Sequence, residues 1–95
     1  MLKHIVLFKM QEGKEEAAET LMEKLRHLPT VTDIPKSFEV GRNVVKLAVN
    51  WDVALVSTFE SVEDLMAYKN LPAHDEFVDY MRTVCEPIKA VDFWE

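Results

Sequence analysis

The chain has little cysteine, little glycine and fewer basic than acidic residues. Its one cysteine, Cys85, has no partner for an internal disulfide and gives no sign of an oxidising compartment. With only Gly13 and Gly41, the chain has no glycine-rich loop that could hold a phosphate group. Lys and Arg number 11 against 17 Asp and Glu, and the net charge is −6. This balance disfavours nucleic acid as a partner, because a phosphate backbone requires a basic face.

Long apolar runs and metal-binding spacings are also absent. No segment approaches the roughly 20 apolar residues of a membrane helix. The N-terminal "MLKHIVLFKM" contains Lys9 and lacks a small-residue cleavage site, so it is a poor signal peptide. The three histidines lie far apart, and one cysteine cannot build a structural zinc site. We therefore expect a cytoplasmic protein that binds no metal, no nucleic acid and no membrane.

The hydrophobic content, 48% of 95 residues, is ample for a folded core. The length suits one domain over residues 1–95. Hydrophobic periodicity predicts strands at 2–10, 36–41, 51–59 and 88–94, and helical segments at 13–28, 61–69 and 72–86. Pro29 is expected to end the first helix, and Ser61 to cap the second with Asp64 three residues later. The order β-α-β-β-α-(α)-β is that of an α+β, ferredoxin-like fold, with a four-stranded antiparallel sheet and helices on one face.

The strands are apolar on both faces, which a sheet covered by helices on one side does not explain. Two sheets that face each other in a homodimer would explain it. The connection at 42–50, "RNVVKLAVN", is unusually apolar, and we expect it to pack against something.

The stretch "AYKNLPAHDEF" at 67–77 contains the strongest candidates for chemistry. Pro72 cannot continue the preceding helix but suits the first turn of a new one. Helical spacing then places His74 on the inward stripe, where burial and a helix N-terminus favour neutral imidazole. His74 is either a satisfied core histidine or a proton acceptor, and Tyr68 is either a core aromatic or a hydroxyl donor. His4, in register with Val6 and Phe8 on the first strand, faces either water or the same site.

Two further residues have structural interpretations. Cys85 lies on the apolar stripe of the last helix without a basic neighbour, which indicates a core residue and not a nucleophile. Asp92 lies within the last strand and is a candidate polar partner for a neighbour, with its role open.

Several motifs together resemble a known family. "KHIVLFK" at the start, "LP" after the first helix, Gly-x-Asn at 41–43, "STFES-x-EDL-x-AY" and "PAHDEF" are similar to the stress-responsive A/B barrel domain family, the dimeric α/β-barrel proteins, over essentially the whole chain. The resemblance implies a ferredoxin-like fold that dimerises by packing two sheets face to face. The family includes plant stress-induced proteins and olivetolic acid cyclase, a polyketide cyclase that performs an aldol closure without a cofactor.

The resemblance implies His4, Tyr68 and His74 as catalytic residues and no cofactor. In that case His74 is the general base, Tyr68 orients or polarises a carbonyl, and His4 supports by hydrogen bonding. One departure is Leu71, which replaces the first histidine of the family's "HPAH" segment.

Three functions remain open. The first is cofactor-independent cyclase- or lyase-like chemistry on a small keto compound, in a pocket between helices and sheet. The second is a non-catalytic, stress-related or ligand-binding homodimer. The third is an enzyme of the same architecture, resembling antibiotic-biosynthesis monooxygenases or haem-degrading proteins.

Overall fold

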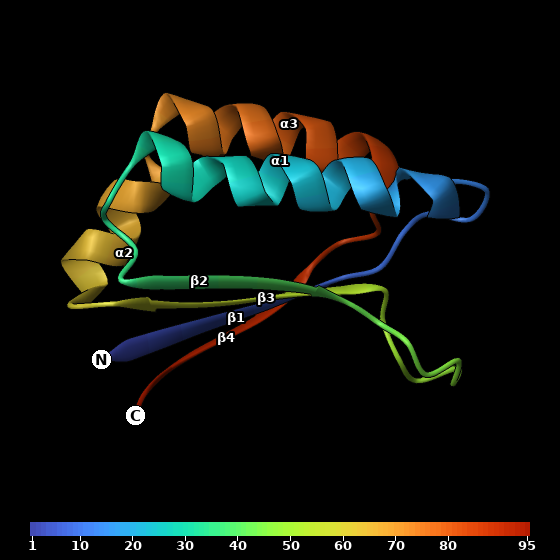
Figure 1. Ribbon diagram of the computed structural model, residues 1–95, viewed down its shortest axis with the longest axis horizontal. Coiled ribbons are helices and arrows are strands. Elements are labelled where there is room, and N and C mark those ends of the chain that lie inside the picture. Colours follow the sequence, from blue (N-terminus) through green and yellow to red (C-terminus); the bar gives the residue numbers. More distant parts are fainter.

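Four strands form one antiparallel sheet in the order β2-β3-β1-β4, and three helices lie on one of its faces (Figure 1). The computed structural model describes residues 1–95. The strands are β1 (Leu2–Phe8), β2 (Ser37–Arg42), β3 (Val53–Phe59) and β4 (Lys89–Trp94). The helices are α1 (Ala18–Val31), α2 (Val62–Lys69) and α3 (Pro72–Val84), and a short 3₁₀ turn, η1 (Glu15–Ala17), precedes α1. The predicted ferredoxin-like α+β fold is confirmed.

The pleat of the central strand β1 decides which side chains reach the helices. Its residues alternate, so that His4, Val6 and Phe8 are buried under the helices while Ile5 and Leu7 turn to the opposite face. In β3 the same alternation buries Val53, Leu55, Ser57 and Phe59. The predicted register of His4 with Val6 and Phe8 is therefore correct, and His4 faces the interior.

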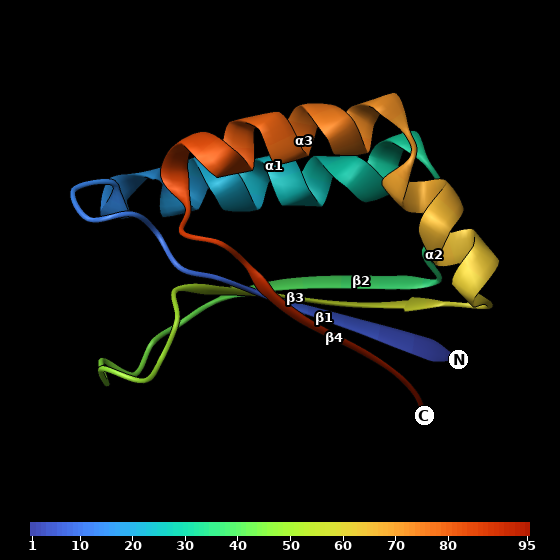
Figure 2. The same ribbon diagram turned by 180° about the vertical axis from the view of Figure 1, so that it is seen from behind.

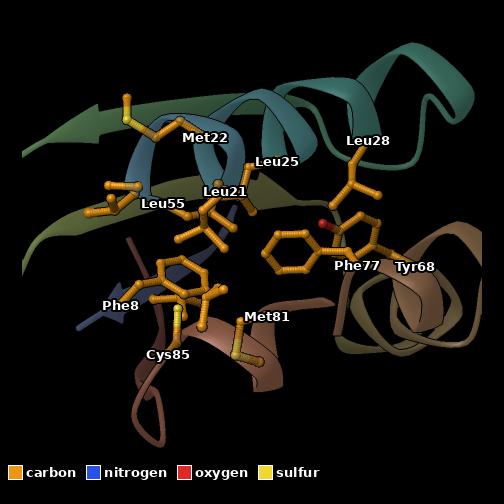
Figure 3. Packing of buried hydrophobic residues seen from close by; sticks show 14 of the residues in the cluster. Phe8, Leu21, Met22, Leu25, Leu28, Leu55, Tyr68, Phe77, Met81 and Cys85 are labelled. Carbon is orange, nitrogen blue, oxygen red and sulfur yellow. The ribbon is translucent and has the colours of Figure 1, made fainter. Parts of the chain in front are cut away.

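The hydrophobic core lies between this sheet face and the pair of long helices. α1 supplies Leu21, Leu25 and Leu28, and α3 supplies Phe77 and Met81. Figure 3 shows these side chains meeting Phe8 and Leu55 of the sheet. The helical period of these residues explains why α1 and α3 each bury one stripe and expose the rest.

The C-terminal ends of α1 and α3 differ from the sequence prediction. Pro29 lies inside α1, which continues to Val31, so the predicted stop at Pro29 is wrong. A proline this near a C-terminus removes one hydrogen bond, and the packing of Leu25 and Leu28 keeps the last turn in place. α3 ends at Val84, before the predicted position 86, because the backbone of Val84 and Glu86 bonds to the segment after β1.

The start of α2 follows its sequence signal. The backbone N–H of Asp64 donates to the Ser61 hydroxyl at 3.0 Å, so Ser61 is the N-cap as predicted. Pro72 occupies the first turn of α3, and Leu71 before it is extended. The chain therefore turns between α2 and α3 at the expected place.

The connection between β2 and β3 projects beyond the sheet (Figure 1). Val44 and Val49 are 85% and 84% exposed, so nothing within the chain covers the apolar residues that the sequence expected to pack. The side-chain amide of Asn50 donates to Asn43 Oδ1 and to the carbonyl of Val45, which closes the loop at its base. The loop is thus a structured apolar projection of the protomer.

The second face of the sheet carries no helix, as the reverse view shows (Figure 2). Its residues include Leu7, Val91 and Phe93, which are all exposed. The two chain termini lie at the same end of the sheet (Figure 2), because β1 and β4 are antiparallel neighbours. None of the helices has the length and apolar character required to cross a membrane.

Candidate functional site

A cavity of about 300 Å³ lies between the helices and the sheet. His4 from β1, Tyr68 from α2 and His74 from α3 all line it, so the fold brings together the three residues singled out in the sequence. Lys69 and Asp75 are its other charged or polar wall residues. The remaining walls are apolar and comprise Val6, Phe8, Leu25, Leu55, Phe77, Val78, Met81, Ile88 and Ala90. Such an apolar pocket with a few convergent polar groups suits a small organic ligand.

Tyr68 is nearly enclosed, with 1% of its surface exposed. Its ring packs against Phe59 and Phe38, with centroids 5.3 and 6.4 Å away. Figure 3 shows the ring beside Phe77 in the core layer. The hydroxyl has no hydrogen-bond partner within the chain, and because no fully buried polar atom lacks a partner, the hydroxyl retains access to the cavity that Tyr68 lines. Burial raises the pKa of Tyr68, so the hydroxyl stays protonated and available as a donor.

His74 lies in the first turn of α3, half-buried, with its ring 5.0 Å from that of Tyr68 between centroids. Burial lowers its pKa, the positive charge of Lys69 and the neighbouring His4 lower it further, and Asp75 opposes them. The ring forms no hydrogen bond with the chain, so it is not a histidine satisfied by a backbone group. His74 is consequently neutral near pH 7 and can accept a proton.

His4 is held by a carboxylate from the neighbouring strand. The Nδ1 atom of His4 donates to Oδ1 of Asp92, which lies directly opposite it in the β1–β4 register. The ring of Phe59 meets the imidazole edge to face, with centroids 6.1 Å apart. Such a carboxylate contact fixes the ring orientation and the tautomer. His4 therefore keeps Nε2, which has no partner within the chain, as its free ring nitrogen.

Sequence reasoning did not assign Asp92, Lys69 or Asp75 to the site. Asp92 had been recognised only as a possible polar partner, because its pairing with His4 depends on a strand register between the two ends of the chain. The available signal was a carboxylate at an inward position of the last strand. Lys69 and Asp75 each adjoin a predicted site residue in sequence, but only the turn at Pro72 places them on the cavity wall.

The thiol of Cys85 lies in the core, away from the candidate site. Cys85 is buried, and burial together with the charge of Asp52 raises the pKa of its thiol to about 11. It remains a thiol packed at 3.9 Å from the sulfur of Met10, as expected of a core residue. No group of three His, Cys, Asp or Glu side chains is arranged to hold a metal ion.

Comparison with known proteins identifies the family. The model of the Stress responsive A/B Barrel Domain matches residues 2–95. The chain belongs to this family. The resemblance seen in its motifs is thereby confirmed over essentially its whole length. A comparison with curated proteins gave no match.

Solved structures share the fold over nearly the whole chain. A dimeric ferredoxin-like protein of unknown function from Bacteroides fragilis is 29% identical, with a TM-score of 0.83, and the alignment covers 97% of this chain and 93% of that one. An Arabidopsis thaliana protein is 26% identical, with a TM-score of 0.84 and coverage of 100% and 95%. A hydroxynitrile lyase from Passiflora edulis, 21% identical, has a TM-score of 0.82 and coverage of 97% and 90%. At 21% identity this last similarity concerns the fold alone.

Proposed function

We propose that this protein binds a small keto compound in the cavity and transfers a proton on it without a cofactor. The observation that carries this proposal is the unpartnered hydroxyl of Tyr68 beside the neutral ring of His74. The hydroxyl can donate to a ligand carbonyl, because it has no partner within the chain and is not sealed from the cavity. The apolar walls favour the hydrocarbon part of the same ligand.

The mechanism follows from a protonated Tyr68 hydroxyl and a neutral His74 ring. Tyr68 donates a hydrogen bond to the carbonyl oxygen, and His74 removes a proton from the adjacent carbon. The enolate that forms keeps its electron pair, with the charge on oxygen stabilised by the Tyr68 hydroxyl. That carbon then either regains a proton from His74 or attacks a second carbonyl in the same molecule, which closes a ring. In the second case the new alkoxide oxygen takes the proton from His74. No electron acceptor is required for either outcome.

His4 acts as a positioning residue in this mechanism. Its ring is oriented by Asp92 and lines the same cavity. Because Nδ1 carries the proton, we expect Nε2 to accept a hydrogen bond from an O–H group of the ligand, such as the enol, and to support the charge that develops near His74. A hydroxynitrile lyase from Passiflora edulis has the same fold, so this architecture carries an enzyme activity in another protein.

The test of catalysis is deuterium exchange. The ketone 4-phenyl-2-butanone is incubated in D₂O with wild-type protein, with His74→Gln and with Tyr68→Phe, and loss of the α-proton signal is followed by NMR. We expect wild-type protein to accelerate exchange, and each substitution to slow it by a factor of about 10² or more. His27→Gln, at the exposed surface of α1, is the matched control and should exchange as the wild type does. If the ketone binds but all variants exchange alike, the protein is a ligand-binding dimer and not a proton-transfer enzyme.

The assembly that we propose is a homodimer in which two sheets pack through their helix-free faces. The exposed Leu7, Val91 and Phe93 on that face would be removed from water by a second copy. The dimeric state of the similar Bacteroides fragilis protein supports this arrangement. A two-fold related pair would be self-complementary at this patch.

The loop between β2 and β3 extends the same surface. A groove links its residues Val49 and Trp51 to Leu7 and Ala54 on the outer sheet face. The side chain of Lys89 covers the Trp51 ring, with its Nζ 5.9 Å from the ring centroid. We infer that the loop contacts the second protomer, which would bury the valines that are exposed in a single protomer.

A further inference from the structure

Lys69 is an ammonium group on the wall of the cavity with no carboxylate partner. The ion pairs of the lysine and arginine side chains are formed by Lys3, Lys36 and Arg42. Lys69 is absent from these pairs, although the chain carries more acidic than basic side chains. It follows Tyr68 directly in sequence, at the end of α2, and both residues line the same space.

The surroundings of Lys69 are suited to a negative charge. The positive end of the α3 dipole lies in the same region, because Pro72 begins that helix and His74 belongs to its first turn. Asp75 is exposed on the wall and is not within ion-pair distance of Lys69. The one lysine of the cavity is therefore available to a ligand.

We propose that the ligand of this cavity is a keto acid with an apolar tail, whose carboxylate binds Lys69 while its keto oxygen accepts from Tyr68. This inference rests on the proposed function and narrows its substrate class. Two independent features point to such a ligand. One is the unpaired ammonium of Lys69, and the other is the unpartnered hydroxyl of Tyr68, whose side chain lines the same cavity. A keto acid carries both a carboxylate and a keto oxygen, so one ligand could contact both groups on the wall of this cavity.

The tail has a defined place in this arrangement. Val78 and Met81 of α3 and Ile88 before β4 line the cavity, and the same three residues border a neighbouring groove. A hydrocarbon or aromatic tail would lie along this wall and lose its contact with water. The cavity would thus bind the charged end near α2 and the apolar end along α3.

A matched pair of ligands tests the inference. The two probes are 4-phenyl-2-oxobutanoate and 4-phenyl-2-butanone, which share the tail and the keto group and differ by a carboxylate in place of a methyl group. Their dissociation constants are measured by calorimetry at low and at high salt. We expect wild-type protein to bind the keto acid about fivefold more tightly than the ketone at low salt, the factor of a partly exposed ion pair. Salt should reduce this preference and leave ketone binding unchanged.

Four variants test whether Lys69 causes the preference for the keto acid over the ketone. Lys69→Gln should abolish it without changing the affinity for the ketone, and Lys69→Arg should retain it. Asp75→Asn should increase it by removing a nearby negative charge. Lys46→Gln, in the exposed loop, is the control and should behave as the wild type does. Because Lys69 also lies in the last turn of α2, a purely structural role would change the unfolding midpoint and affect both ligands equally.

The outcomes separate this inference from the proposed function. Equal affinity of wild-type protein for both ligands, or a preference that survives Lys69→Gln, overturns the keto-acid inference and leaves ketone binding intact. If neither ligand binds, the proposed function itself fails, and the inference fails with it.

Discussion

The rings of Tyr68 and His74 meet edge to face, with their centroids 5.0 Å apart and their planes at 71°. They belong to different helices, and the turn at Pro72 brings them together. Burial favours the protonated phenol in one and the neutral imidazole in the other. A hydrogen-bond donor and a proton acceptor therefore lie side by side on the wall of an apolar cavity.

The stability of the protein should fall as the pH drops below about 6.5 because of His74. Its pKa is lowered from 6.5 in the folded state, so below 6.5 the unfolded chain binds a proton that the folded chain does not. The free energy of unfolding therefore decreases as the pH falls from the unfolded-state pKa of His74 to its folded-state pKa. Well above pH 6.5 the contribution of His74 is constant. Urea unfolding about one pH unit above and below 6.5 should show a smaller pH dependence for His74→Gln than for wild type. Equal dependence in both proteins would contradict the assigned pKa direction.

The cap of α2 should contribute measurably to stability. Ser61→Ala removes the acceptor for the Asp64 N–H, and we expect a loss of about 1 kcal/mol in the free energy of unfolding. Ser61→Asp keeps an acceptor at the cap and should remain close to wild type. Chemical denaturation measures all three proteins. A loss as large in Ser61→Asp as in Ser61→Ala would show that the capping bond is not the cause.

The proposed dimer should depend on Leu7. This side chain is 40% exposed on the helix-free face of the central strand β1. Leu7→Asp places a charge in the centre of the proposed interface, and we expect the dimer to become a monomer in light scattering after size-exclusion chromatography. Because Leu7 is partly exposed in the protomer, the fold should survive, which circular dichroism checks.

The matched control for the dimer is Val62→Asp. Val62 is 48% exposed at the start of α2, where a negative charge is favourable. This variant should have the mass of the wild type. A monomeric wild type, or a dimer unaffected by Leu7→Asp, would refute packing through this face.

Haem should not bind in the cavity. The cavity volume of about 300 Å³ suits a small ligand, and a porphyrin is considerably larger. Added haemin should therefore give no protein-dependent shift of its Soret band. A shift that disappears in both His4→Ala and His74→Ala would instead favour the haem-degrading alternative.

The elements of the fold could be predicted because their signals are local. Alternation in β1, the Ser61 cap and the break at Pro72 each need only a few neighbouring residues. Pro29 misled the prediction because its local preference is outweighed by packing of α1 against the sheet. The sequence alone does not show whether the low helix propensity of a residue or the tertiary packing of its helix has the larger effect.

The site was predictable only in part. Tyr68 and His74 share one short stretch, but His4 required a resemblance to place it with them. The contact of His4 with Asp92 joins residues separated by 88 positions and depends on the sheet register. The cavity depends on how α3 lies over β1 and β4, which no local pattern specifies.

The most direct measurement of the central claim is the carbonyl ¹³C chemical shift of bound 4-phenyl-2-butanone labelled at that carbon. A hydrogen bond from Tyr68 polarises the carbonyl, so we expect a downfield shift in wild-type protein. Tyr68→Phe should bind the ketone without that shift, and Tyr80→Phe, at a half-buried position of α3 that does not line the cavity, should retain it. An identical shift in wild type and Tyr68→Phe would contradict the claim that Tyr68 holds the carbonyl beside His74.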